Sequence, residues 1–100
     1  MIPGMTDQIV RSFAPIRIIL FGSQARGEAN PSSDIDLLVV LPYITDKRKT
    51  AIEIRRALAS YSVPKDILVT TPEEISRRGN LVGTLLRTAL MEGKTLYERA

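Results

Sequence analysis

The chain has 100 residues, of which 44% are hydrophobic and 25% charged, a balance that is typical of one globular domain and argues against wholesale disorder. It contains no cysteine and no histidine, which excludes a disulfide scaffold, a thiol nucleophile and the usual zinc ligands. The net charge of +3 is modest and spread over several segments, so direct nucleic-acid binding is not expected. No run approaches the length of a membrane span and no signal pattern opens the chain, so we expect a cytoplasmic protein.

Helical and strand patterns alternate along the chain. Thr6 or Asp7 can cap a first helix that ends before Pro15. Runs of β-branched and alternating residues predict strands at 16–21, 34–41, 63–69 and, as a short edge strand, 95–97. Helical spacing and caps predict further helices at 46–61, from Thr71 to Gly79, and at 81–91. Strands separated by helices indicate an α/β or α+β fold, with helices packed on a single sheet.

Two carboxylates open the second predicted strand. Successive side chains of a strand point to opposite faces, so Asp34 and Asp36 share a face that Ile35 does not. Such a pair is costly to bury without a counter-charge, which indicates a divalent cation, and Mg²⁺ held by carboxylates and substrate phosphates fits best. The alternative is a strand entrance with solvated acids, or with acids that form hydrogen bonds after Ser33.

The residues that follow the first predicted strand suit a phosphate. Gly22 lets the backbone approach a ligand closely, and Ser23 can cap a short helix, contact a phosphate, or do both. The N-terminus of a helix that follows a strand presents free N–H groups and partial positive charge to a nucleotide. Arg26 either contacts phosphate or braces the loop by pairing with Asp34 or Asp36.

A third candidate carboxylate lies on the next predicted strand. Asp66 shares one face of that strand with Leu68, and a carboxylate on a short buried strand needs a partner. The site at Asp34 and Asp36 is the best candidate for that partner. The alternative is an exposed turn, because Asp66 follows shortly after Pro64.

Two motifs carry a family resemblance. Gly22-Ser23-Gln24-Ala25-Arg26-Gly27 followed by Ser33-Asp34-Ile35-Asp36-Leu37-Leu38-Val39 resembles the signature of the DNA polymerase beta-like nucleotidyltransferase superfamily. The small size makes residues 1–100 look like one domain of its minimal nucleotidyltransferase (MNT) branch, of the MntA antitoxin type. This resemblance implies a small mixed sheet and transfer of AMP from ATP, with two Mg²⁺ ions that bridge the three carboxylates to the triphosphate. It also implies that Asp66 is the general base, or a ligand that orients the attacking hydroxyl.

The resemblance implies a partner as well. Members of the MNT branch often act as the antitoxin of a small helical HEPN-domain toxin, so we expect a hydroxyl of a cognate toxin, a tyrosine, as the acceptor. We also expect association into a homo- or hetero-oligomer. The alternative is a non-catalytic antitoxin that neutralises its partner by direct complex formation, through apolar residues on the last helices and near Tyr97.

Overall fold

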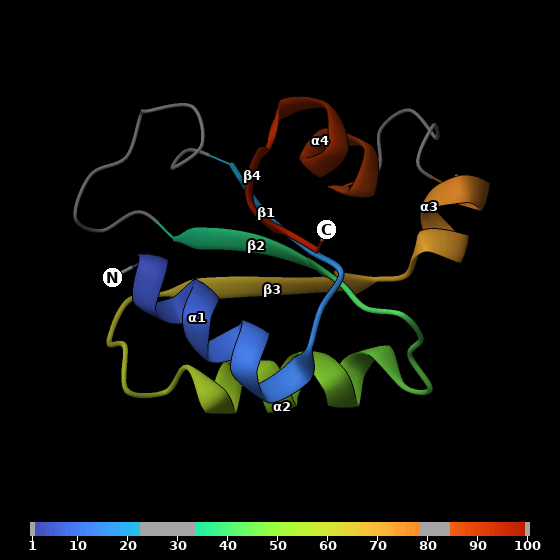
Figure 1. Cartoon of the computed structure of the whole chain (residues 1–100). Helices are drawn as coiled ribbons and strands as arrows, with labels where there is room; N and C mark the ends of the chain where they lie inside the picture. Colours follow the sequence, from blue (N-terminus) through green and yellow to red (C-terminus); the bar gives the residue numbers. More distant parts are fainter. Residues whose placement is uncertain (1, 23–33, 79–84, 100) are drawn as a thin grey trace.

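The computed structural model describes residues 2–22, 34–78 and 85–99 of the chain (Figure 1). Within these residues helices and strands follow one another as predicted. Their bounds are α1 (Ile2–Phe13), β1 (Arg17–Phe21), β2 (Ile35–Val40), α2 (Lys47–Ala57), β3 (Lys65–Thr70), α3 (Pro72–Arg78), α4 (Leu85–Glu92) and β4 (Lys94–Glu98). None of the helices described is long and apolar enough to cross a membrane.

The four described strands form one mixed sheet in the order β3-β2-β1-β4. β1 is antiparallel to both β2 and β4, whereas β2 and β3 run parallel. Parallel neighbours need a crossover connection, and α2 provides it. The expected mixed sheet with helices packed on it is therefore confirmed, and β3 and β4 are its edge strands.

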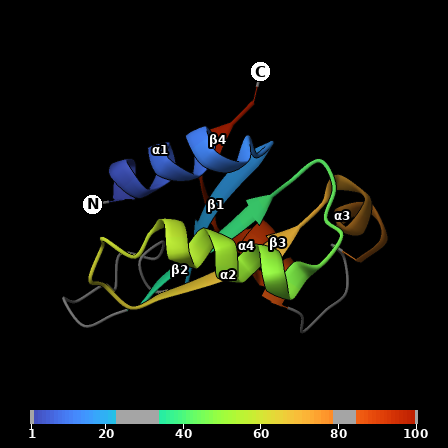
Figure 2. The same cartoon turned by 90° about the horizontal axis from the view of Figure 1, so that it is seen from below.

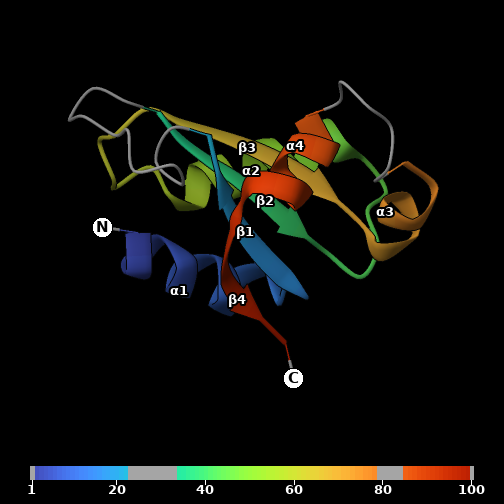
Figure 3. The ribbon, with the colours of Figure 1, turned by 90° about the horizontal axis from the view of Figure 1, so that it is seen from above.

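Helices cover both faces of the sheet. α1 and α2 lie on one face and α4 lies on the other, while α3 follows the far end of β3 (Figures 1 to 3). β2 is buried from both sides, which explains its nearly continuous hydrophobic run. The cluster on the side of α1 and α2 includes Met5, Ile9, Ile35, Leu37, Val39, Ile54 and Leu58. The cluster on the side of α4 includes Ile19, Phe21, Leu38, Val40 and Ala89.

The predicted start of the first helix is wrong. α1 already begins at Ile2, and the Thr6 hydroxyl donates a hydrogen bond of 2.9 Å to the carbonyl of Ile2 instead of capping. A threonine inside a helix commonly bonds back to the carbonyl four residues earlier. The N-terminal turn is held by tertiary packing, because Met5 is buried in the core.

Both α2 and α3 begin at a side-chain cap, and the cap at Thr71 is the predicted one. Asp46 caps α2 and accepts a hydrogen bond of 3.1 Å from the Lys49 N–H, and the Thr71 hydroxyl accepts one of 3.2 Å from the Glu74 N–H. α2 ends at Ala57, earlier than the predicted residue 61. The Leu58 N–H is shared among carbonyls of the preceding turn, which closes the helix there.

Candidate active site

The predicted site lies at the end of the sheet where β1 stops and where β2 and β3 begin. The antiparallel register places Phe21 opposite Asp36, and the parallel register places Asp36 opposite Asp66. Partners in neighbouring strands point to the same face, so the two carboxylates lie on one side of the sheet. The fold thus brings Asp36 and Asp66 together, although they are far apart in sequence. Their chemical roles stay predictions.

The carboxylates lie on the face of the sheet that carries α4. Asp36 alternates with Leu38, and Asp66 with Leu68, and both leucines belong to the cluster on that side. α4 packs on β1, at the opposite side of β2 from β3. The site is therefore built at the corner of the sheet between β1, β2 and the edge strand β3.

The exposure of the three carboxylates differs. Asp36 is half-buried, and Asp34 is exposed directly before β2 begins. The Asp66 side chain is 64% exposed, and its Oδ1 atom lies 3.8 Å from Nη2 of Arg55 in α2. Asp66 is thus neither a buried carboxylate nor part of an exposed turn, but belongs to an edge strand and has a cationic neighbour.

Gly22 makes the closest backbone approach to the site. Its φ of +75° lies in the left-handed region, and a Cβ atom there would come within 2.2 Å of Asp36 Oδ2. Real Cβ atoms essentially never come within 3.0 Å of another heavy atom, so a side chain at this position would displace the Asp36 carboxylate and strain the backbone. The sequence prediction assigned Gly22 to the approach of a ligand. In the structure its missing side chain makes room for the Asp36 carboxylate.

Two predicted site residues lie outside the described part of the chain. These are Ser23 and Arg26, and their predicted contacts with phosphate stay predictions. Sequence reasoning also missed Arg55, because nothing in the local pattern of its helix ties it to the candidate site. Only the tertiary arrangement of α2 against β3 brings Arg55 to Asp66.

The donor chemistry of the site fits a hard divalent cation. Asp34, Asp36 and Asp66 offer only carboxylate oxygens, which Mg²⁺ prefers. In the part of the chain that the structure describes, no three acidic, histidine or cysteine side chains are gathered into a complete metal centre. Mg²⁺ usually needs only one or two carboxylates, since substrate phosphates and water supply its other ligands. The residues present therefore fit an ion that is held together with a nucleotide.

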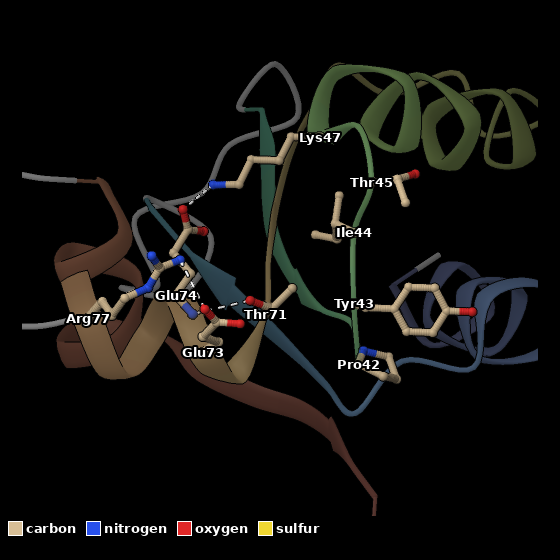
Figure 4. A pocket seen from close by; sticks show the side chains of 9 residues that line it. All are labelled: Pro42, Tyr43, Ile44, Thr45, Lys47, Thr71, Glu73, Glu74 and Arg77. Carbon is tan, nitrogen blue, oxygen red and sulfur yellow. Dashed lines mark hydrogen bonds and ion pairs between the residues drawn. The ribbon is translucent and has the colours of Figure 1, made fainter.

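A separate pocket lies at the other end of the sheet. It has a volume of about 260 Å³, and it is bordered by the loop after β2 and by α3 (Figure 4). Its charged side chains are paired with each other. Glu74 binds Lys47 and accepts a hydrogen bond of 2.5 Å from the Thr70 hydroxyl, and Arg77 lies 3.6 Å from Glu73. None of the predicted site residues lines this pocket, and the pair of Lys47 with Glu74 joins the start of α2 to α3 there.

Two relatives from Methanocaldococcus jannaschii resemble the chain in sequence, and both carry the provisional name protein adenylyltransferase. One is 39% identical over 57 residues, which are 54% of this chain and 54% of the relative. The other is 34% identical over 85 residues, which are 81% of this chain and 77% of the relative. The chain thus spans about half the length of the first relative and about three quarters of the second.

Solved structures share the fold at low sequence identity. A toxin–antitoxin structure with AMP-PNP has a TM-score of 0.72 at 22% identity, with 99% of this chain and 75% of that chain covered. A variant of the toxin–antitoxin MntA–HpeT has a TM-score of 0.73 at 20% identity, with 99% and 73% covered. A protein from Sulfolobus solfataricus, provisionally named a nucleotidyltransferase, has a TM-score of 0.67 at 20% identity, with 98% and 78% covered.

These likenesses agree with a match to a family model. The model of the nucleotidyltransferase domain family matches residues 6–97, from the first helix to the last strand. The matched range contains the sheet corner with Gly22, Asp36 and Asp66. The chain belongs to the nucleotidyltransferase domain family.

Proposed function

We propose that this chain is a Mg²⁺-dependent nucleotidyltransferase that transfers AMP from ATP to a tyrosine hydroxyl of a cognate HEPN-type toxin, and so acts as the antitoxin. The observation that carries the proposal is the strand register, which sets Asp36 beside Asp66 where Gly22 leaves room for the Asp36 carboxylate. Relatives named protein adenylyltransferase and neighbours that are toxin–antitoxin structures, one with AMP-PNP, support it. We place the whole activity in one domain, residues 1–100, in the cytoplasm.

Each site residue has a role in the proposed reaction. Asp34, Asp36 and Asp66 would hold the cation, and Gly22, Ser23 and Arg26 would meet the phosphates. When bound, Mg²⁺ supplies charge neutralisation and a template for in-line attack. The tyrosine oxygen attacks the α-phosphorus of ATP, and the bond from that phosphorus to pyrophosphate breaks. Asp66 accepts the proton of the attacking hydroxyl, or orients that hydroxyl.

The position of Asp66 supports a macromolecular acceptor. Its carboxylate is mostly exposed and lies on an edge strand, so a side chain of another protein can reach it without entering a closed cavity. Nucleotidyl transfer needs positioning and charge neutralisation more than covalent help from the protein. An open corner with exposed carboxylates meets both needs when the acceptor brings its own recognition surface.

Intact-mass spectrometry of the toxin from the neighbouring gene tests the proposal, after incubation with this protein, ATP and Mg²⁺. We expect added mass of one or more AMP units, and no added mass with the double variant Asp34→Ala, Asp36→Ala. Asp7→Ala is the matched control, because it removes an exposed carboxylate from α1 and should leave the transfer unchanged. Added mass that persists with the double variant would refute the assignment of these carboxylates.

A second candidate function is neutralisation by direct binding alone. β4 is an edge strand of the described sheet, and Met91 on the neighbouring α4 is 69% exposed, so this region offers a surface to a partner. Tyr97 contributes less than expected because it packs against the core. A stable complex without added mass, combined with neutralisation by the double variant, would favour this function over transfer.

A further inference from the structure

Arg55 reaches the Asp66 carboxylate from the opposite layer of the molecule. Asp66 points to the face of the sheet that carries α4, whereas α2 packs against the other face (Figure 2). Arg55 Nη2 therefore comes within 3.8 Å of Asp66 Oδ1 by extending past the edge of the sheet. It can do so because β3 is an edge strand of the described sheet. Both side chains are more than half exposed, at 56% and 64%.

Arg55 differs from the other cations of its helix. α2 carries five basic residues and one acidic residue, so most of its cations have no acidic partner within the helix. Lys47 binds Glu74 at the far end of the sheet, and Arg56 lies with Arg48 and Glu53 on another side of the helix. Within residues 2–22, 34–78 and 85–99, Arg55 is the α2 residue whose side chain pairs with a carboxylate of the candidate site.

We propose that Arg55 is a positioning residue that holds the Asp66 carboxylate at the outer edge of β3 and competes with the divalent cation for it. The proposal rests on the proposed function, since it takes Asp34, Asp36 and Asp66 as the cation site. Arginine stays protonated, so a cation that contacts Asp66 has a fixed positive charge nearby. Without nucleotide, the positive charge of Arg55 weakens cation binding. When ATP is bound, the negative charge of its phosphates offsets this effect of Arg55.

The size of the competition follows from Coulomb's law. With the guanidinium and a divalent ion on the same carboxylate, their separation is about 6 Å. In a solvent-like dielectric at moderate salt, this repulsion lowers cation affinity by about threefold to tenfold. Loss of an exposed pair of this kind has little effect on folding stability, so cation affinity can be measured without a confounding loss of structure.

Direct titration with Mn²⁺, followed by electron paramagnetic resonance of the free ion, tests the proposal without ATP or acceptor. The full chain is compared with Arg55→Gln, with Arg55→Lys, and with Arg56→Gln as the matched control. The two glutamine variants change the net charge and the helix equally, since glutamine and arginine are similar helix formers. We expect Arg55→Gln to bind Mn²⁺ about threefold to tenfold more tightly, and the other two variants to stay within about twofold of wild type.

Asp66→Asn separates contact with this carboxylate from long-range charge. With Asp66→Asn present, adding Arg55→Gln should change Mn²⁺ affinity no more than Arg56→Gln does, because the shared partner is gone. Unchanged or weaker binding by Arg55→Gln, while wild type binds Mn²⁺, overturns the role of Arg55 and leaves the proposed function intact. Absence of Mn²⁺ binding by both wild type and Arg55→Gln overturns the competition, whereas the ion that is held together with a nucleotide is tested separately by the transfer assay.

Discussion

Gly22→Ala tests the closest contact at the candidate site. The substitution adds a Cβ atom that would lie 2.2 Å from Asp36 Oδ2 and 3.1 Å from Asp36 Cγ. It also forces alanine into the left-handed region at a φ of +75°. We expect a large loss of AMP transfer together with a small loss of stability, because the carboxylate must move while the core of the sheet is untouched.

The structure indicates the size of both effects. Backbone strain of an L-residue in the left-handed region costs about 1–2 kcal/mol of unfolding free energy. Because Cβ contacts under 3.0 Å essentially never occur, the Asp36 carboxylate has to retreat by most of an ångström. A misplacement of about 1 Å at a reacting centre can lower the rate by about a hundredfold. Activity should thus fall far more than the folded fraction does.

Pyrophosphate release in the presence of ATP, Mg²⁺ and the toxin measures activity, and urea unfolding measures stability. Gly22→Asn separates strain from contact, because asparagine tolerates the left-handed region but carries the same Cβ atom. It should recover stability and not activity. Gly4→Ala is the matched control, since its Cβ also meets a side-chain oxygen, the Tyr61 hydroxyl at 2.5 Å, but lies in helix α1 and not at the candidate site. A Gly22→Ala variant that transfers AMP at the wild-type rate would refute the reasoning.

The remaining predictions concern a helix cap, the far end of the sheet and the cation. Asp46→Ala should lower the unfolding free energy by about 1 kcal/mol in urea, because the Lys49 N–H loses its acceptor, whereas Asp46→Asn should keep the cap. Glu74→Ala removes the acceptor of the buried Thr70 hydroxyl and the partner of Lys47, and it should lower the unfolding free energy by about 1–3 kcal/mol. Glu74→Gln should lower it less, and equal losses for the two variants would contradict the role of the Thr70 hydrogen bond. Chelation of divalent cations should stop AMP transfer and added Mg²⁺ should restore it, as followed by intact mass; transfer that survives chelation would exclude the cation.

Local sequence patterns predicted the elements of this fold well. The hydrophobic run of β2 indicated a strand, and Asp46 and Thr71 marked the starts of their helices. These signals depend on contacts within a few residues of each other. The start of α1 was predicted wrongly because it depends on the tertiary burial of Met5. The Thr6 hydroxyl donates to a carbonyl inside the helix and does not cap it.

The arrangement of the site depends on contacts between distant segments. Alternation along a strand predicted which face Asp66 occupies, but no local pattern gives the register that sets it opposite Asp36. The contact of Gly22 with the Asp36 carboxylate and that of Arg55 with Asp66 also join separate elements. The residue types of the site were therefore predictable from the sequence, whereas the neighbours that constrain them were not.

Stability and proposed chemistry occupy opposite ends of the same parallel strand pair. At the far end Thr70, Glu74 and Lys47 tie β3 to α3 and to the start of α2, and the Thr70 residue is only 1% exposed. At the near end the carboxylates stay at least partly exposed, and a glycine leaves room for one of them. Carboxylates that repel each other destabilise a fold unless a cation or a partner compensates. A firmly bonded far end helps the sheet to offset the cost of grouping carboxylates at the near end, which is where we propose that an ion, a nucleotide and an acceptor meet.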